Sequence, residues 1–301
     1  MALFARAVNR IEIETHSYCN RRCDYCPNVS GDRLGENRRM ADDVWFLALG
    51  NLREIDYAHS LVLNNYNEPL ADKMIVERIK QAREYLPRAR IMIYSNGDYL
   101  NKDYLGELAE AGLDYLHISI HTHGHRKYSD VGALNHIVKL SRRLDLPVKF
   151  REMKSSEYIF ANIPYPTLEI EVRAIDYWRY GMDRGGLVEG FSKEFIRTDP
   201  CHFPFSHFQI GYAGAIVPCC QIRSDSRDHT AYHYGNLKHF GTIFEAFGSP
   251  IATGWRRHLI SLETKDPPCR TCTAIFFTQA PQDLAHARRA WEHYVRDTPL
   301  P

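Results

Sequence analysis

Three cysteines lie close together near the start of the chain, in the segment Cys19-Asn-Arg-Arg-Cys23-Asp-Tyr-Cys26-Pro27. The segment follows Ile11–Thr15, whose alternating apolar and polar residues predict a strand. Four cysteine thiolates complete the ligand set of an ordinary [4Fe–4S] cluster. Three cysteines on one loop would leave one iron open to a small molecule. A zinc loop or three free thiols are the alternative interpretations.

The spacing of these cysteines, just after a first strand, resembles the cluster loop of the radical S-adenosylmethionine (AdoMet) enzymes. The resemblance implies that the open iron chelates the amino and carboxylate groups of AdoMet. It further implies that one electron from the cluster cleaves AdoMet to a 5′-deoxyadenosyl radical. Tyr25, which lies inside the loop, would then be a cofactor-binding residue.

Composition argues against several other classes of protein. The chain of 301 residues has a formal net charge of +1, so it has no basic excess that would attract nucleic acid. No apolar run of about 18 residues predicts a membrane span, and the N-terminus does not read as a signal peptide. The eight cysteines occur in tight clusters, which is typical of metal binding inside cells. We expect a cytoplasmic, oxygen-sensitive protein.

Strand-like and helix-like stretches alternate from residue 11 to about residue 153. The predicted strands are Ile11–Thr15, Leu61–Leu63, Ile91–Tyr94, Tyr115–Ile120 and Val148–Phe150, and the predicted helices are Asp42–Glu54, Asp72–Tyr85, Lys102–Ala111 and Val131–Leu144. This order predicts an α/β fold with a parallel sheet, whose active face lies at the carboxyl ends of the strands. The resemblance implies a partial (β/α)6 TIM-like barrel over residues 1–195. Its sixth strand would lie within Leu168–Val172 or near Ile175–Trp178.

Polar residues follow the second, third and fourth predicted strands, where AdoMet would lie. The segment ending in Asn67 and Glu68 resembles the family's Gly-Gly-Glu motif, which receives the methionine amino group, although Asn67 replaces a glycine. By the same resemblance, Ser95 and Asn96 lie near the methionine carboxylate and ribose. The remaining candidates, Ser119 and His121, could contact ribose or substrate. Each of these residues could also belong to an ordinary turn at the end of a strand.

Two further polar segments have competing interpretations. His121-Thr-His123-Gly-His125 could bind a metal, although substrate contact is the preferred interpretation. Arg184 precedes a pair of glycines, which resembles the radical AdoMet dehydrogenase of 2-deoxystreptamine assembly. In that enzyme the arginine lies between the substrate and a second cluster. A surface turn with a solvated arginine is an equally good interpretation.

The C-terminal part contains a second set of cysteines. Phe208–Pro218 reads as a β-hairpin with a glycine turn that would bring Cys201 and Cys219 together. This order resembles the twitch domain, a shortened relative of the SPASM domain that holds one auxiliary [4Fe–4S] cluster. The resemblance implies that the domain spans residues 196–301 with a C-terminal helix, and that its ligands are Cys201, Cys219, Cys269 and Cys272. A zinc site would use the same four thiolates. Cys220 is left over, as a structural thiol, an alternative ligand or a hydrogen-atom donor.

Two reactions begin with the loss of a hydrogen atom from an alcohol- or amine-bearing carbon. The size and order of the chain resemble aminoglycoside-pathway enzymes, namely the amino-cyclitol dehydrogenase and the neomycin C epimerase. The epimerase is the first hypothesis and the dehydrogenase, which forms a ketone, is the alternative. A non-catalytic iron–sulfur electron carrier or sensor belongs to a third class. We expect a polycationic sugar or cyclitol substrate and an electron donor such as flavodoxin or ferredoxin, but no nucleic acid or membrane partner.

An epimerase needs a thiol that returns a hydrogen atom to the substrate. Cys220 is one candidate donor. Ser249 lies in the region where the neomycin-type epimerase carries its donor, so it would either depart from that pattern or replace a native cysteine. In the alternative interpretation Ser249-Pro250 simply ends a helix. Carboxylates near the predicted strand ends could bind a polycation: Asp98, Glu152, Glu157, Glu169, Glu171 and Asp183.

Overall fold

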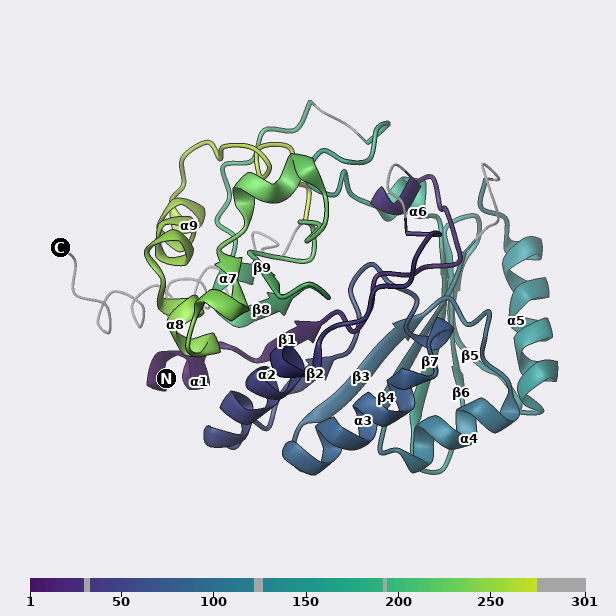
Figure 1. The fold of residues 1–301 in the computed structure, drawn as a ribbon. Coiled ribbons are helices and arrows are strands. Elements are labelled where there is room, and N and C mark those ends of the chain that lie inside the picture. Colours follow the sequence, from purple (N-terminus) through teal and green to yellow (C-terminus); the bar gives the residue numbers. More distant parts are fainter. Residues whose placement is uncertain (30–32, 122–126, 192–193, 275–301) are drawn as a thin grey trace. The chain divides into compact units, whose positions relative to one another are not determined.

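The computed structural model describes residues 1–29, 33–121, 127–191 and 194–274. It divides into two compact units (Figure 1). The first unit consists of Ile13–Met40 and Asp56–Gly181, and the second of Met1–Glu12, Ala41–Ile55 and Met182–Pro301. A domain boundary after residue 195 stays a prediction. Within the described ranges, no helix is both long enough and apolar enough to cross a membrane.

A mixed sheet in the order β2-β3-β4-β7-β6-β5 forms the centre of the first unit. Its strands are β2 (Ser60–Val62), β3 (Arg90–Ser95), β4 (Tyr115–Ile120), β5 (Lys149–Lys154), β6 (Tyr158–Ile163) and β7 (Glu169–Ile175). β2, β3, β4 and β7 are parallel, whereas β6 is antiparallel to both β7 and β5. The parallel strands end at one edge of the sheet, so the polar segments that follow β2, β3 and β4 are brought together there.

The helices of the first unit are α3 (Met74–Tyr85), α4 (Lys102–Glu110), α5 (Asp130–Leu144) and the short α6 (Tyr177–Tyr180), with 3-10 turns η1 (Pro27–Val29) and η2 (Pro69–Ala71). α4 packs against both α3 and α5 along the sheet (Figure 1). Side-chain caps start two of them: Asn101 accepts a hydrogen bond from the N–H of Tyr104, and Ser129 accepts one from Gly132. Ile118 and Ile120 of β4 are buried. Ser119 points to the opposite face because side chains alternate along a strand.

The strand predicted at Val148–Phe150 is confirmed in part by β5, which runs in the same direction as β7 but does not pair with β4. β5 is antiparallel to β6 and lies at the end of the strand order, and β7 pairs with β4 instead. β7 covers most of the predicted Leu168–Val172 segment. Every residue of β5 is exposed, so no buried face distinguishes it in the sequence. A tight turn with Ser156 at a φ of +61° reverses the chain into β6.

The second unit combines short helices with the strand order β10-β9-β8-β1. Its strands are β1 (Arg10–Ile13, whose last residue belongs to the first unit), β8 (His207–Ile210), β9 (Ala215–Val217) and β10 (Gly235–Asn236). Its helices are α1 (Ala2–Ala7), α2 (Asp42–Glu54), α7 (Phe203–Ser206), α8 (Ile243–Gly248) and α9 (Pro250–Ile260), with 3-10 turns η3 (Arg227–Tyr232) and η4 (Leu237–His239). The predicted hairpin is confirmed as β8–β9, with Gly214 in the left-handed region at a φ of +83°.

A cluster of phenylalanines packs the core of the second unit. The Phe4 ring meets Phe208, Phe244 and Phe247 edge-on, with centroids 5.2–5.4 Å apart. Nearby, the side-chain oxygen of Asn51 accepts a hydrogen bond from the N–H of Ile243 at 2.9 Å, which joins α2 to the start of α8. Segments from both ends of the chain therefore share one core.

Candidate functional site

The loop of Cys19, Cys23 and Cys26 is held in place by backbone and side-chain contacts of the first unit. Cys19 N–H donates to the carbonyl of Arg33 at 2.9 Å, and Cys26 N–H donates to that of Cys23 at 2.9 Å. Arg33 in turn forms an ion pair with Glu14 that is almost fully buried. Removing one partner of such a pair is costly. The buried ion pair between Arg33 and Glu14 therefore stabilises the position of the loop.

Burial raises the pKa of the Cys19 thiol to about 12 and that of Cys23 to about 11. The thiolate forms are thus disfavoured unless a positive centre offsets the loss of hydration. Iron bound to the sulfurs would supply that positive charge, because a coordinated thiol is deprotonated outright. The donor set and its partial burial fit a cluster at this loop.

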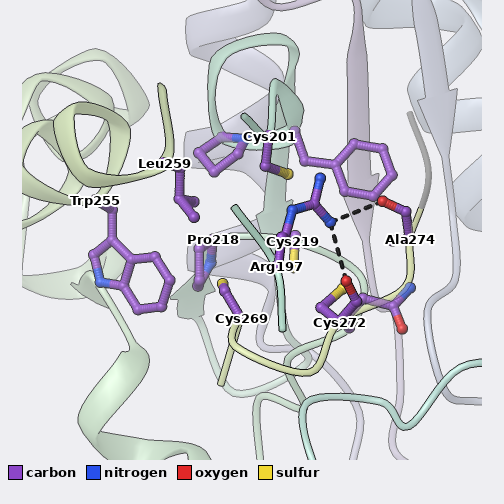
Figure 2. Close-up of a pocket in the computed structure, with 12 residues that line it drawn as sticks. Arg197, Cys201, Pro218, Cys219, Trp255, Leu259, Cys269, Cys272 and Ala274 are labelled. Atoms are coloured by element: carbon purple, nitrogen blue, oxygen red, sulfur yellow. Dashed lines mark hydrogen bonds between the residues drawn. The ribbon is translucent and has the colours of Figure 1, made fainter. Parts of the chain in front are cut away.

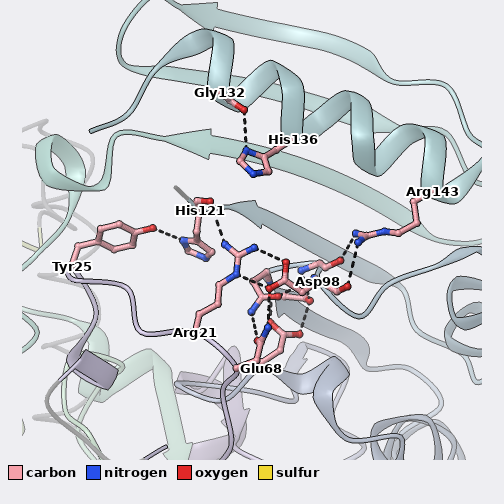
Figure 3. A network of polar contacts seen from close by, with 12 residues as sticks. Arg21, Tyr25, Glu68, Asp98, His121, Gly132, His136 and Arg143 are labelled. Atoms are coloured by element: carbon pink, nitrogen blue, oxygen red, sulfur yellow. Dashed lines mark hydrogen bonds and ion pairs between the residues drawn. The ribbon is translucent and has the colours of Figure 1, made fainter. Parts of the chain in front are cut away.

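The carboxylate of Glu68 joins the polar segments that follow β2 and β3. It accepts hydrogen bonds from Ser95 Oγ at 2.6 Å, Asn96 N–H at 2.7 Å and Leu70 N–H at 3.1 Å (Figure 3). Glu68 N–H donates to the carbonyl of Tyr18 at 2.9 Å, next to the cysteine loop. Three of the predicted AdoMet-binding residues, namely Glu68, Ser95 and Asn96, are thereby brought into contact.

Glu68 is buried, and no cation of the described ranges forms an ion pair with it. Burial raises its pKa from the ordinary 4.5 to about 7. The folded chain therefore loses stability as the pH rises from 4.5 through about 7, since ionisation is harder in the folded state than in the unfolded one. An ammonium group beside Glu68 would remove this penalty, so the site fits the amino group of AdoMet.

Asn67, which replaces the family's glycine, is also buried. Its Oδ1 accepts a hydrogen bond from Asn65 N–H at 3.1 Å, while its Nδ2 has no hydrogen-bond partner among the described residues. Asn67 thus lies next to Glu68, in the segment where the resemblance predicts the AdoMet site. Its contact with a cofactor stays a prediction.

Arg21 connects the cysteine loop to the ends of β3 and β4. Its guanidinium binds both carboxylate oxygens of Asp98 and donates to the carbonyl of His121 at 3.2 Å (Figure 3). Asn20 donates to the same carboxylate at 2.8 Å and accepts from Asn96 Nδ2 at 2.8 Å. The loop residues between the first two cysteines are thus bonded to the predicted cofactor region.

Three aromatic rings stack beside the cysteine loop. Tyr25 stacks on Tyr177 of α6 with centroids 4.6 Å apart, and His121 stacks on Tyr177 at 5.0 Å. The Tyr25 hydroxyl also hydrogen-bonds His121 Nδ1 at 2.9 Å. Sequence reasoning singled out Tyr25 and His121 but missed Tyr177, which lies in a segment without clear periodicity. The histidines at 123 and 125 lie outside the described residues.

The six carboxylates proposed for a polycationic substrate already have partners within the chain. Those partners are Arg21 for Asp98, Tyr158 for Glu152, Lys154 for Glu157, Arg90 for Glu169, Arg173 for Glu171 and Thr271 for Asp183. Four of the carboxylates are thus already paired with a cation, which weakens the argument for a polycation, whereas Glu152 and Asp183 are bonded to neutral hydroxyls.

Four cysteines of the second unit line a single cavity. They are Cys201, Cys219, Cys269 and Cys272, and Arg197, Trp255 and Leu259 complete much of the wall (Figure 2). Burial raises the pKa of all four thiols. Cys220 is absent from the lining, and its sulfur accepts a hydrogen bond from Gln221 Nε2 at 3.6 Å. The arrangement gathers the predicted ligand set and leaves Cys220 aside.

The spacing of the thiols bears on the zinc alternative. A single zinc ion binds sulfur at about 2.3 Å, so its four ligands crowd together. Among the described residues, no group of three or more histidine, cysteine or acidic side chains lies close enough to hold one metal ion. In a four-iron cluster each cysteine binds a different iron, which allows wider spacing. The choice between zinc and a four-iron cluster at this cavity stays a prediction.

The turn that carries Arg184 is tied to the second cysteine set. Asp183 accepts hydrogen bonds from Thr271 Oγ1 at 2.6 Å, between Cys269 and Cys272, and from Gly185 N–H at 3.2 Å. Arg184 itself has a φ of +52° and donates to Gln221, which lines the cavity, at 3.5 Å. The Arg184 side chain is thus bonded to a residue of the cavity wall, which disagrees with the interpretation of a fully solvated surface arginine.

His229, which sequence reasoning missed, supports the same turn. Arg223 N–H donates to its Nδ1 at 2.8 Å, so the ring proton must reside on Nε2, which lies 3.1 Å from the carbonyl of Gly185. Burial lowers the pKa of His229, in agreement with this neutral tautomer. An isolated histidine in a polar segment gives no sequence signal for such a role.

Ser249 joins two helices. Its N–H donates to the carbonyl of Ala246 at the end of α8, and its hydroxyl accepts from Ala252 N–H at 3.3 Å as the N-cap of α9. The helix-ending interpretation of Ser249-Pro250 thus describes its local structure. Its correspondence to a hydrogen-donor position stays a prediction.

Comparison with known proteins identifies the family. The family described as the radical SAM superfamily, in which SAM denotes AdoMet, matches residues 13–163. This chain belongs to the radical SAM superfamily. Across 209 residues it is 35% identical to the S-adenosyl-L-methionine-dependent 2-deoxy-scyllo-inosamine dehydrogenase of Niallia circulans, covering 69% of this chain and 72% of that protein.

One further relative supports the assignment, and one solved structure supports the fold. GTP 3′,8-cyclase of Campylobacter jejuni subsp. doylei is 31% identical over 282 residues, with coverage of 78% and 87%. Crystalline BtrN in complex with AdoMet and 2-DOIA superposes with a TM-score of 0.61 and 22% identity, covering 89% of this chain and 94% of that one. The α/β partial-barrel fold class is confirmed, and membership of the superfamily implies an enzyme with a [4Fe–4S] cluster and AdoMet.

Proposed function

We propose that this radical SAM enzyme is a dehydrogenase that oxidises a secondary alcohol of an amino-cyclitol or amino sugar to a ketone. The similarity to a dehydrogenase of this type over more than two thirds of both chains carries the proposal. The four-thiol cavity beside Arg184 supports it, because oxidation needs an acceptor for the last electron. The comparisons favour this alternative over the epimerase hypothesis.

In this proposal the residues of the first unit bind and orient AdoMet. Cys19, Cys23 and Cys26 would hold the first cluster, and Glu68 would receive the amino group of AdoMet. Asn67, Ser95, Asn96 and Ser119 would line the rest of the site, with Tyr25 and His121 bordering it beside the cysteine loop. When bound, the first cluster and AdoMet would supply the radical that removes a hydrogen atom, and a second cluster would supply an acceptor for one electron.

The residues of the second unit would provide for the second half of the oxidation. Cys201, Cys219, Cys269 and Cys272 would hold the second cluster. Arg184 would hold a fixed positive charge beside it, since the Asp183–Thr271 hydrogen bond joins its turn to the cysteine loop. The reaction balances when the substrate loses one hydrogen atom to the deoxyadenosyl radical, then one proton and one electron.

Anaerobic turnover with 2-deoxy-scyllo-inosamine tests the proposal directly. The reduced enzyme with AdoMet should yield a ketone lighter than the substrate by two hydrogen atoms, together with an equal amount of 5′-deoxyadenosine. Substrate deuterated at the reacting carbon should transfer its label to the deoxyadenosine. Mass spectrometry reads both products.

The same experiment in D2O distinguishes the other hypotheses. A product of unchanged oxidation state with one deuterium and inverted configuration would contradict the dehydrogenase and restore the epimerase, with Cys220 or position 249 as the donor site. If the chain neither binds nor cleaves AdoMet, it is instead an electron carrier or sensor.

AdoMet binding should depend on pH through Glu68. The ionised carboxylate attracts an ammonium group, and its pKa of about 7 means that the fraction ionised falls below neutral pH. The Kd for AdoMet should then approach an increase of about tenfold for each pH unit below 7. Equilibrium dialysis with labelled AdoMet across the neutral range measures it. Glu68→Gln should bind weakly and without this slope, and a slope equal to that of the unaltered chain would contradict the role.

A further inference from the structure

Two positively charged side chains of the second unit are buried close to the four-thiol cavity. Arg197 is 3% exposed and lines the cavity, and Lys265 is 0% exposed. The N–H of Lys265 donates to the carbonyl of Arg197 at 3.0 Å, so the two residues belong to one local structure. The sequence gives no reason to expect either residue inside the protein, because lysine and arginine are almost never fully buried unless they are paired.

Arg197 donates most of its hydrogen bonds to backbone carbonyls, and its side chain also contacts the thiol of Cys272. The acceptors are the carbonyl oxygens of Asp199 at 3.1 Å, Pro200 at 2.9 Å, Cys272 at 3.3 Å and Ala274 at 2.8 Å. Figure 2 shows the guanidinium directed at the last two, beside the sulfur-lined cavity. These bonds use four of its five N–H groups, and none of them is accepted by a carboxylate.

Lys265 has the same kind of surroundings. Its ammonium group donates to the carbonyl of Ser261, to Ser261 Oγ at 3.0 Å and to the carbonyl of Glu263 at 2.9 Å. Within the described ranges, no carboxylate forms an ion pair with Lys265 or with Arg197. Burying a charge is costly unless an opposite charge offsets it. Two such charges in one place indicate that an anionic partner completes the site.

The thiols are the available source of that negative charge. Arg197 lines the same cavity as the four sulfurs, and Lys265 is joined to Arg197 by a backbone hydrogen bond. A four-iron cluster with four thiolate ligands carries two negative charges when oxidised and three when reduced. Two fixed cations therefore balance the oxidised form and attract the reduced form more strongly.

We propose that Arg197 and Lys265 are the counterions of the second cluster and raise its reduction potential, which favours transfer of an electron from the substrate radical. This inference rests on the proposed function, since it requires that the four thiols hold a redox-active cluster. Both residues act through the cluster and are positioning residues. Their charge, rather than the hydrogen bonds that they donate, is the feature that matters.

The chain contains a matched control for this effect. Arg270 directly follows the proposed ligand Cys269 in the sequence, but its side chain is exposed. Water and salt screen an exposed charge far more than a buried one. Arg270→Gln removes the same charge as Arg197→Gln and should leave the potential unchanged.

The measurement uses the full-length chain with Cys19, Cys23 and Cys26 replaced by alanine, so that only the second cluster gives a signal. After anaerobic reconstitution, iron analysis and an EPR-monitored redox titration give its content and potential. Arg197→Gln and Lys265→Gln should each shift the potential to a more negative value. Arg197→Lys keeps the charge and should stay near the unaltered potential, although it loses part of the carbonyl contacts.

Each other outcome has a definite meaning. Unchanged potentials in both glutamine variants at full iron content would overturn the inference. A shift in Arg197→Lys as large as that in Arg197→Gln would also overturn it, because the effect would then come from hydrogen bonding. If neither glutamine variant retains iron while Arg197→Lys does, the charge is needed to hold the cluster, which supports the proposal. An unaltered chain with zinc or no iron at these thiols would refute the second cluster itself.

Discussion

Replacing Cys19, Cys23 and Cys26 together with alanine is expected to reduce the formation of 5′-deoxyadenosine from AdoMet to the background level. The three thiols are the only cysteines of the first unit, and the loop that carries them is bonded to the segments around Glu68 and Asp98. Without them no open iron is held beside the AdoMet site. Liquid chromatography of an anaerobic, dithionite-reduced reaction measures the product.

This variant should keep about half of its iron, because four cysteines remain at the other cavity. Retained iron is the control that the chain still folds. Continued formation of deoxyadenosine at a rate near that of the unaltered enzyme would contradict the assignment of the loop and of its resemblance to the radical AdoMet enzymes.

Replacing Cys269 and Cys272 with alanine should have the opposite selectivity. About half of the iron should be lost, and formation of the ketone should stop, since the substrate radical would have no acceptor for its electron. Deoxyadenosine should still form, because the first cysteine set lies in the other unit. Iron analysis, together with mass spectrometry of both products, separates the two effects.

Cys220→Ala is the matched control for this variant. Cys220 adjoins Cys219 in sequence but does not line the cavity, so both clusters and ketone formation should be retained. Loss of turnover in Cys220→Ala with a full complement of iron would favour a thiol hydrogen donor and hence an epimerase. Full iron in the Cys269 and Cys272 variant would refute the four-thiol site.

The parts of the fold with strong local patterns could be predicted from the sequence. The helix predicted at Asp42–Glu54 and the strand predicted at Tyr115–Ile120 have the observed bounds. Both combine regular apolar spacing with a buried face. The order of the strands was less accessible, because β6 was not predicted and it lies between β5 and β7 in the sheet. Its residues alternate between partly buried and buried positions, but the segment has no local signal that fixes its neighbours.

The candidate sites were predictable to the extent that they depend on the spacing of cysteines. The two cysteine sets were found because the ligand types and intervals are themselves distinctive. The stacking of Tyr177 on Tyr25, the burial of Lys265 and the contact of Arg197 with the cavity depend on how distant segments pack. Single residues of these types occur throughout the chain, so their roles emerge only in three dimensions.

The four thiols of the second unit come from three segments that are far apart along the chain, around residues 201, 219 and 270. A group bonded to all of them is a cross-link, and it closes two long loops whose freedom the unfolded chain would otherwise keep. Its binding energy then becomes folding energy for this unit. Loss of the group to oxygen would therefore remove a structural cross-link as well as an electron acceptor. Inactivation and unfolding of the unit would then occur together.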